Sequence, residues 1–242
     1  MNLGLIAALP REARSLGVTP PLPMCPLPLP GLGELVVSGM GCERARRAAQ
    51  HLADRGARQL VSWGLAGALQ PGLTSGQQLC PTAVVDSEGR RYPVTADLQT
   101  ACLAWVCPGA ETADLISWAE VLFDPKQKQA LYRDRGCVAV DMESTAIAQV
   151  ARERKLDFVV LRTVFDSAEQ IFPVSVLDNT DAWGSVRVGG LAAALLRTPS
   201  DLLLLPGLAC PARRSGQSLK AMARALPALA QGNHLEKKRT TV

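Results

Sequence analysis

Histidine and aromatic residues are scarce in this chain of 242 residues. Its only histidines are His51 and His234, and aromatic side chains make up 4% of the composition. A metal site that uses imidazole ligands needs further ligands at short spacings, and neither histidine has such a partner. A serine or cysteine hydrolase triad needs a histidine too, and neither one lies near a predicted strand end. The sequence therefore predicts no metal site and no cofactor, and a core filled by aliphatic side chains and alanine.

The sequence also lacks the cysteine pattern of a disulfide framework or a zinc site. It has seven cysteines, an odd number, and no CxxC pair. Most of them lie in apolar runs, where a cysteine behaves as a small buried hydrophobic residue. We therefore expect reduced cysteines and a cytoplasmic protein.

Long hydrophobic segments and charge clusters are missing as well. No run approaches the roughly 20 apolar residues that cross a bilayer, and the longest, 201–209, is interrupted by Pro206 and Gly207. The first 13 residues lack the basic start of a signal peptide. The net charge of +4 is mild. Because a nucleic-acid binder usually has a clustered basic face, no nucleic-acid partner is expected.

Several motifs of nucleotide and ester chemistry are absent. The chain has neither a P-loop nor a GxSxG elbow. It contains Gly31-x-Gly33, but these glycines precede a predicted strand, whereas a dinucleotide-binding fingerprint follows a strand and opens a helix. A dehydrogenase of the Rossmann type is therefore disfavoured.

What is present is an alternation of strand-like and helix-like segments. Continuous apolar runs such as 3–9 are typical of strands that are buried on both faces. The segment 42–56 has apolar residues at helical spacing and ends at Gly56. The predicted strands are 3–9, 34–39, 59–69, 76–92 with a turn at Glu88–Gly89, 113–123, 137–142 and 158–166. The predicted helices are 42–56, 124–136, 143–155, 185–197, 199–205 and 216–230.

This alternation predicts an α/β fold with a single three-layer domain. The proline-rich segment 21–33 is unsuited to a central strand or a helix interior, so we expect it to form a loop or an extended cover. The domain is expected to span residues 1–235. The residues 236–242 are expected to form a charged, frayed tail.

Charged residues and glycines lie at the ends of four predicted strands, where ligands gather in open α/β sheets. These residues are Glu12, Gly64, Gly67, Asp141, Met142, Glu143, Arg162 and Asp166. Most have a structural explanation when taken singly, as helix-dipole partners, turn formers, caps or core filler. Arg162 is the exception, because a buried guanidinium needs a carboxylate, a phosphate or several carbonyls. Their joint occurrence predicts an active site at this edge of the sheet.

Five segments resemble, in order, the purine nucleoside phosphorylase and nucleosidase superfamily. They are GLIAALPREAR, VVSGMGCERARRAA, SWGLAGALQPGLTSGQQL, VAVDMESTAIAQVA and FVVLRTVFDSAE, within residues 1–170. The VDMES segment is the most specific, and the set is most similar to the methylthioadenosine/S-adenosylhomocysteine nucleosidases. The resemblance implies a central mixed, twisted sheet flanked by helices. It also implies a homo-oligomer that acts on a small adenine nucleoside.

A narrower resemblance, to the hopanoid-associated branch of this superfamily, rests on PREAR, LFDPKQKQAL, VDMES and the C-terminal segment from Val188. It implies removal of adenine from adenosylhopane, a lipid precursor. The apolar run 201–209, the loop 21–30 and nearby basic residues would suit a membrane surface at the inner face. These basic residues are Arg213, Arg214, Lys220 and Arg224. Alternatively, such helices simply close a core or a dimer interface.

The resemblance also implies a role for each site residue. Asp166 would protonate purine N7, Glu12 would activate the attacking water, and Arg162 would organise the carboxylates. Glu143 would accept hydrogen bonds from the ribose hydroxyls, with Met142 against the ribose face. The remaining substrate-binding positions are Gly64, Gly67 and, in the adenine loop near 121–123, Phe123. Asp141 is expected to cap the helix that follows it.

The nucleophile separates two readings of this site. Phosphorylases of the family hold phosphate with arginines and a serine around the glycine-rich turn, where this chain has Ser62 and Leu65. Leu65 also replaces a serine that nucleosidases of the family use near the water, so this departure counts against both readings. Arg11 and Arg14 remain available to an anion. Glu12 favours water, because a carboxylate activates water and repels phosphate. We therefore expect hydrolysis. The alternatives are a nucleosidase for a small substrate such as methylthioadenosine, a phosphorylase, and an inactive nucleoside-binding protein.

Overall fold

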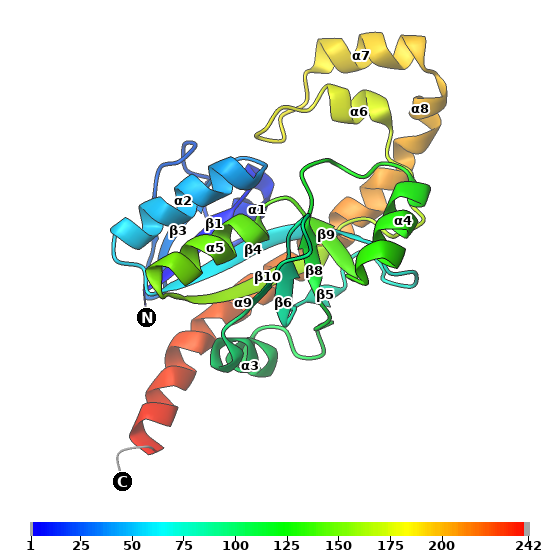
Figure 1. Cartoon of the computed structure of the whole chain (residues 1–242). Coiled ribbons are helices and arrows are strands. Elements are labelled where there is room, and N and C mark those ends of the chain that lie inside the picture. Colours follow the sequence, from blue (N-terminus) through cyan, green and yellow to red (C-terminus); the bar gives the residue numbers. More distant parts are fainter. Residues whose placement is uncertain (1, 240–242) are drawn as a thin grey trace.

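The centre of the fold is a set of four parallel strands (Figure 1). The computed structural model describes residues 2–239. In it, β1 (Leu3–Ala7) lies between β3 (Gly33–Val37) and β4 (Gln59–Ala68), and β10 (Asp157–Val164) lies on the other side of β4. Their side chains are largely buried on both faces, which explains why these segments are continuously apolar.

The strand β4 changes its partner along one edge. Its first half pairs with β1, in which Ala7 lies opposite Trp63. Its end pairs antiparallel with β9 (Ala139–Asp141), in which Val140 lies opposite Gly67. Between these two ladders the described part of the chain places no strand, so this edge is open over residues 64–66.

The remaining strands make the sheet mixed. From β9 it continues through β8 (Leu115–Ser117), β6 (Ala83–Val85) and β7 (Arg91–Pro93). The strands β2 (Leu27–Leu29) and β5 (Gln78–Leu79) pair antiparallel with β3 and β10. The prediction of a mixed sheet flanked by helices is confirmed. The proline-rich segment enters the sheet only through β2, an edge strand, because proline cannot donate to a central ladder.

Helices cover both faces of the sheet. On one face, α2 (Cys42–Asp54) and α5 (Ser144–Arg154) pack side by side (Figure 1). Their buried alanines share an apolar cluster with the strands. The other face is covered by α1 (Pro10–Ser15), α3 (Ala96–Trp105) and α9 (Pro206–Arg239). There Leu98, Leu219 and Met222 lie in one cluster with Trp63.

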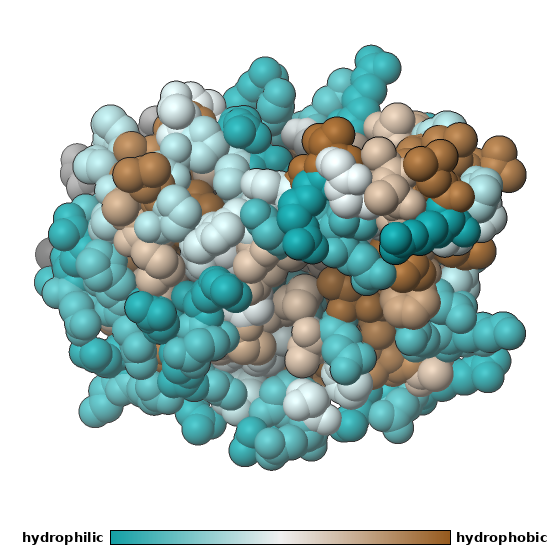
Figure 2. All heavy atoms as spheres, turned by 90° about the horizontal axis from the view of Figure 1, so that it is seen from above, coloured by the Kyte–Doolittle hydropathy of each residue, from teal (hydrophilic) through white to brown (hydrophobic). Residues whose placement is uncertain are grey.

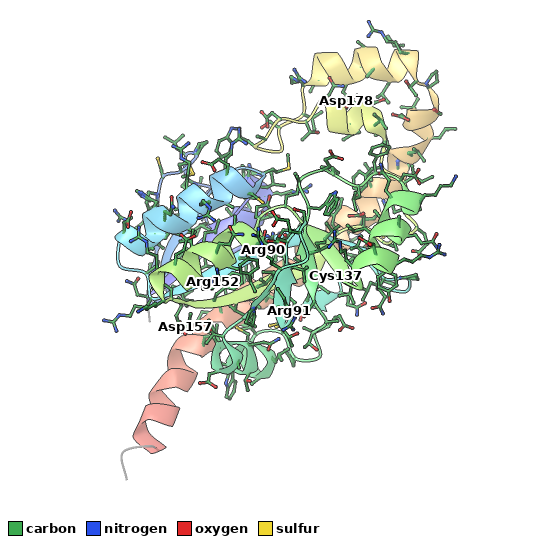
Figure 3. The ribbon with its side chains drawn as sticks, viewed as in Figure 1. Arg90, Arg91, Cys137, Arg152, Asp157 and Asp178 are labelled. Carbon is green, nitrogen blue, oxygen red and sulfur yellow. The ribbon has the colours of Figure 1, made fainter. Side chains whose placement is uncertain are left out.

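Three short helices form a projection that we call the arm, residues 174–204. They are α6 (Val174–Asp178), α7 (Val188–Arg197) and α8 (Ser200–Leu204). In Figure 3, Asp178 marks the arm, apart from Arg90 and Arg91 of the β6–β7 hairpin. Within residues 2–239 no single helix meets the length and apolarity of a membrane span. The pair formed by α7 and Ser200–Leu229, bent by 113°, meets that test together.

The elements confirm some predictions and correct others. The helix predicted at 124–136 is α4 (Pro125–Arg135), capped by the Asp124 carboxylate and ended by left-handed Gly136. The strand predicted at 113–123 is only β8, because the residues after Ser117 leave the sheet.

The sequence prediction missed α1, α3 and α6. In α3, the exposed Trp105 and buried Leu98 leave no clear apolar stripe, which hides the helical period. The helix predicted at 216–230 begins earlier, at Pro206, and the boundary expected at residue 235 falls inside α9. The expected tail continues beyond Arg239 into residues that lie outside the described part of the chain.

Candidate active site

The open edge of β4 brings two charged side chains against its backbone at Gly64. A Cβ atom at this position would lie 2.5 Å from both Glu12 Oε1 and Arg162 Nη1. Any side chain would therefore push apart the two groups that we had placed together from the sequence. Gly67 lies three residues further along β4. A Cβ atom there would lie 3.3 Å from Asp166 Oδ1. Gly64 is thus needed for close approach, whereas a Cβ atom at Gly67 would require Asp166 to shift by a few tenths of an ångström.

Glu12 lies in α1 and fills the gap in the strand ladder. Its Oε1 accepts the Leu65 N–H at 2.9 Å and its Oε2 accepts the Leu9 N–H at 2.9 Å. The indole N–H of Trp63 donates to the Glu12 carbonyl at 3.3 Å and to Ser15 Oγ at 3.1 Å. The carboxylate is therefore oriented by two backbone donors, and α1 is tied to β4.

Arg162 is almost fully buried on β10 and forms an ion pair with Asp141. Its Nη2 lies 2.8 Å from Asp141 Oδ2 and donates to Ser62 Oγ at 2.9 Å and to Glu143 Oε2 at 3.4 Å. We expected it to organise both Glu12 and Glu143. The structure shows the contact with Glu143, whereas the described residues contain no hydrogen bond between Arg162 and Glu12.

Asp141 has the structural role expected for it. Its Oδ1 accepts a hydrogen bond from Ser117 Oγ at 2.6 Å and from the backbone N–H of Ser144 at 3.3 Å, at the start of α5. The side chain therefore joins β8, α5 and Arg162. Asp141 and Glu143 both line the cavity, and the ion pair of Asp141 with Arg162 and its bonds to Ser117 and Ser144 give it a structural role.

Glu143 is anchored from two sides. Its Oε1 accepts the Gly41 N–H at 2.9 Å, and its Oε2 lies 3.4 Å from Arg162 Nη2. Burial raises the pKa of Glu143 to about 7, although the neighbouring Arg162 acts in the opposite direction. The result is a fixed carboxylate that changes its charge close to neutral pH.

Asp166 follows β10 and pairs with a residue that the sequence analysis missed. The buried Lys128 of α4 forms an ion pair with Asp166 Oδ2. Its Nζ also donates to the carbonyls of Ser167 at 2.8 Å and Gln170 at 3.3 Å. Burial raises the pKa of Asp166, and Lys128 opposes this shift.

A weak signal for Lys128 exists in the sequence. It precedes the buried Leu131 by three residues, and positions three apart lie on the same side of a helix. A lysine in phase with a buried leucine faces the protein interior and needs an anion there. Its neighbour Lys126 is exposed.

A cavity of about 510 Å³ adjoins these groups, and Glu143 and Asp166 line it, whereas Glu12 and Arg162 do not. Its polar side includes Asp166, Lys128, Glu143 and Asp141. Leu9 and Leu65, whose N–H groups bind Glu12, line it as well. Its apolar side comes from the arm, from the start of α9 and from two stacked rings with centroids 5.8 Å apart, Phe165 and Phe172. Arg11 lies at the mouth, with its guanidinium carbon 4.9 Å from the centre of the Phe165 ring.

Two further predicted residues are placed as follows. Met142 lines the cavity beside Glu143. Phe123 does not line it, and its carbonyl accepts the Phe172 N–H at 3.0 Å. The neighbouring Val121 and Leu122 face the cavity instead. Among the side chains that the structure describes, no group of three or more His, Cys, Asp or Glu residues is arranged to hold a metal ion.

Solved structures with this fold include three nucleosidases. The 5′-methylthioadenosine/S-adenosylhomocysteine nucleosidase of Campylobacter jejuni has a TM-score of 0.68 at 15% identity, covering 95% of this chain and 98% of that one. The same enzyme from S. pneumoniae has a TM-score of 0.64 at 18% identity, covering 93% and 100%. The futalosine hydrolase of Helicobacter pylori has a TM-score of 0.63 at 16% identity, covering 93% and 97%.

At these identities the likeness establishes the fold. No curated protein sequence matches the chain. A family profile described as "Phosphorylase superfamily" matches residues 34–198, which is more than half of the chain. The matched region contains the glycine-rich strand, Glu143, Arg162 and Asp166, and the chain therefore belongs to the phosphorylase superfamily.

Proposed function

We propose that the protein is an N-ribosyl hydrolase that releases adenine from an adenine nucleoside. The observation that carries this proposal is that two buried carboxyl groups line one cavity and are bound by different partners. Glu143 is anchored by Gly41 and Arg162, whereas Asp166 is paired with Lys128. The two groups are thus held by different partners and can serve different ends of a nucleoside.

The residues divide the chemistry as follows. Glu143 accepts hydrogen bonds from the ribose 2′- and 3′-hydroxyls, and Met142 packs against the ribose. As the C1′–N9 bond breaks, the electron pair of this bond passes to the base, and Asp166 donates a proton to N7. Glu12 takes a proton from the water that attacks C1′. The products are neutral adenine and a ribosyl compound, and the developing positive charge on the ribose is stabilised by the carboxylates.

The surroundings of the glycine-rich strand favour water over phosphate. Ser62 is buried and bound to Arg162 and Ser144, so it is not available to an anion. Leu65 presents an aliphatic side chain to the cavity. The competing reading is a phosphorylase, and Arg11 at the mouth is the residue that would hold the phosphate.

For the substrate we propose an adenosyl-lipid, converted as adenosylhopane to ribosylhopane. The cavity wall formed by Val176, Val186, Leu208 and Ala212 is apolar and belongs to the arm and α9. The outer side of the arm also exposes Val188, Leu196 and Leu203. Figure 2 shows hydrophobic residues gathered on the side of the molecule where the arm lies. Exposed apolar side chains on the arm together with an apolar cavity wall suit a substrate with a large hydrocarbon portion.

We further propose that the enzyme works in the cytoplasm, at the inner face of the membrane, as a homo-oligomer. The exposed basic residues Arg213, Arg214, Lys220 and Arg224 on α9 would face anionic lipid headgroups. The loop 21–30 does not line the cavity. The alternative substrate is a small nucleoside such as methylthioadenosine, for which the arm would only close the cavity or an interface between subunits.

Adenine release distinguishes these functions. The purified protein is incubated with adenosylhopane in detergent and with methylthioadenosine, each with and without phosphate. We expect adenine and ribosylhopane at a rate that phosphate does not change. A ribosyl phosphate product would establish the phosphorylase instead, and faster turnover of methylthioadenosine would remove the lipid proposal. No adenine from any nucleoside would support a binding protein.

A further inference from the structure

Lys128 is a buried charged residue at the cavity that the proposed chemistry leaves unused. Among the lysines whose side chains the structure describes it is the one that is buried, and it lies at the cavity. Transferring an ammonium group out of water is costly unless its charge and its N–H groups are satisfied. The burial of Lys128 therefore indicates a role other than filling the core.

The hydrogen bonds of Lys128 define its charge. Its Nζ faces three oxygen acceptors, Asp166 Oδ2, the Ser167 carbonyl and the Gln170 carbonyl. An ammonium group has three N–H donors, whereas a neutral amine has two. The three acceptors therefore favour the protonated lysine.

These bonds also fix the position of Asp166. Lys128 comes from α4, whereas Ser167 and Gln170 belong to the segment after β10. The lysine thus ties this segment to α4 at the point where Asp166 enters the cavity. Because Oδ2 is bound to Lys128, Oδ1 is the oxygen that remains for a bound base.

We propose that Lys128 is a positioning residue for the acid step: its ammonium group holds Asp166 in place and stabilises the carboxylate that remains after proton transfer. This inference rests on the proposed function, in which Asp166 is the acid. As the C1′–N9 bond breaks, the O–H bond of Asp166 breaks and an N7–H bond forms. Lys128 keeps its three protons throughout and pairs with the new carboxylate.

Two opposing effects then set the acidity of Asp166. Burial raises the pKa of Asp166 and keeps the proton on it, whereas the cation of Lys128 eases its departure. Other charged groups line the same cavity, but among the described residues none of them forms a hydrogen bond or ion pair with Asp166 or Lys128. They are Arg11, Glu120, Asp141 and Glu143.

The test is the pH profile of kcat for Lys128→Met, with Lys126→Met as the matched control on the same helix. The assay follows adenine release from whichever adenine nucleoside the wild-type enzyme turns over. Without the cation, the alkaline limb of Lys128→Met should move up by about one pH unit or more. Its kcat should fall by about 10- to 100-fold, while KM changes little. Lys126→Met should match the wild type.

Two outcomes must be told apart. A Lys128→Met enzyme whose kcat falls while its alkaline limb stays at the wild-type position would show a merely structural lysine. An Asp166→Asn enzyme with wild-type turnover would instead remove the proposed function itself. If Asp166→Asn is inactive and the alkaline limb of the Lys128→Met profile does not shift, only the proposed role of Lys128 is rejected.

A measurement on the wild-type protein covers the case in which Lys128→Met does not fold. The ¹⁵N signal of Lys128 Nζ, assigned with Lys128→Arg, is followed across the alkaline limb. We expect it to remain that of an ammonium group over the whole limb. Deprotonation of Lys128 within the limb would overturn the proposal, because the cation would then be lost together with activity.

Discussion

The strand ends beneath the cavity bury their charged side chains, whereas the arm above it leaves large apolar side chains in solvent. Glu12, Glu143 and Arg162 are at most 5% exposed. On the arm, by contrast, Leu196 is 84% exposed and Leu203 is 82% exposed. Each buried charge has several partners from different elements, so its position is strongly constrained. The exposed leucines have few partners to constrain them.

This contrast separates two tasks. Bond breaking needs groups held within a fraction of an ångström, and the sheet provides them. In the proposed function, selection of an apolar substituent on the ribose needs apolar area, and the arm would provide that. Substitutions beneath the cavity should therefore affect every substrate alike, whereas substitutions on the arm should affect only substrates that reach it.

The largest effect is expected for Asp166→Asn. Asparagine cannot donate a proton to N7, so kcat should fall by about 10³-fold while nucleoside binding largely survives. Adenine release measures kcat, and calorimetric titration with a non-hydrolysable nucleoside analogue measures binding. The melting temperature shows whether the fold is destabilised because Lys128 has lost its anionic partner. Near-wild-type turnover would remove Asp166 from the acid role.

Gly64→Ala tests the close approach at β4. The new Cβ atom would lie 2.5 Å from both Glu12 and Arg162, so we expect a destabilisation of about 1–3 kcal/mol. Turnover should fall for soluble and lipid-linked substrates by the same factor. Gly216→Ala on α9 is the control, because its Cβ atom meets nothing within 4 Å. Denaturant unfolding compares the two, and equal stabilities would contradict the crowding at Gly64.

The charge of Glu143 predicts a pH dependence of binding. Its raised pKa of about 7 means that the carboxylate is ionised above neutral pH and becomes protonated as pH falls. Since the ionised form accepts the ribose hydroxyls, KM should rise by about tenfold per pH unit below 7. Glu143→Gln cannot ionise, and its KM should be high and independent of pH over this range. A wild-type KM that is flat from pH 5 to 8 would contradict this role.

The smallest and most selective effect is expected on the arm. Leu196→Ser with Leu203→Ser changes exposed positions, so the free energy of unfolding should change by less than about 0.5 kcal/mol per site. Turnover of a soluble nucleoside should stay at the wild-type rate. Binding to anionic vesicles and turnover of the lipid-linked substrate should fall several-fold. An equal loss for both substrates would show that the arm serves the chemistry rather than the lipid.

Much of the sheet and of the site was predictable from the sequence, because both depend on local patterns. Buried parallel strands are continuous apolar runs, and glycines and carboxylates stand directly after them. The partners across the site were harder to predict. Lys128 is brought to Asp166 by tertiary packing of α4, and no local pattern ties the two together. The partner of Arg162 was uncertain for the same reason, since Asp141 and Glu12 are both carboxylates at strand ends.

The open edge of β4 also has a consequence for folding. The contact between Leu65 and Glu12 joins residues 53 positions apart, that between Gly41 and Glu143 joins residues 102 apart, and that between Lys128 and Asp166 spans 38. Contacts of such long sequence separation require the closure of large loops, and the packed core must compensate the entropy that this closure costs. The site therefore exists only when distant segments have come together, and activity becomes a sensitive reporter of whether the chain has reached its native topology.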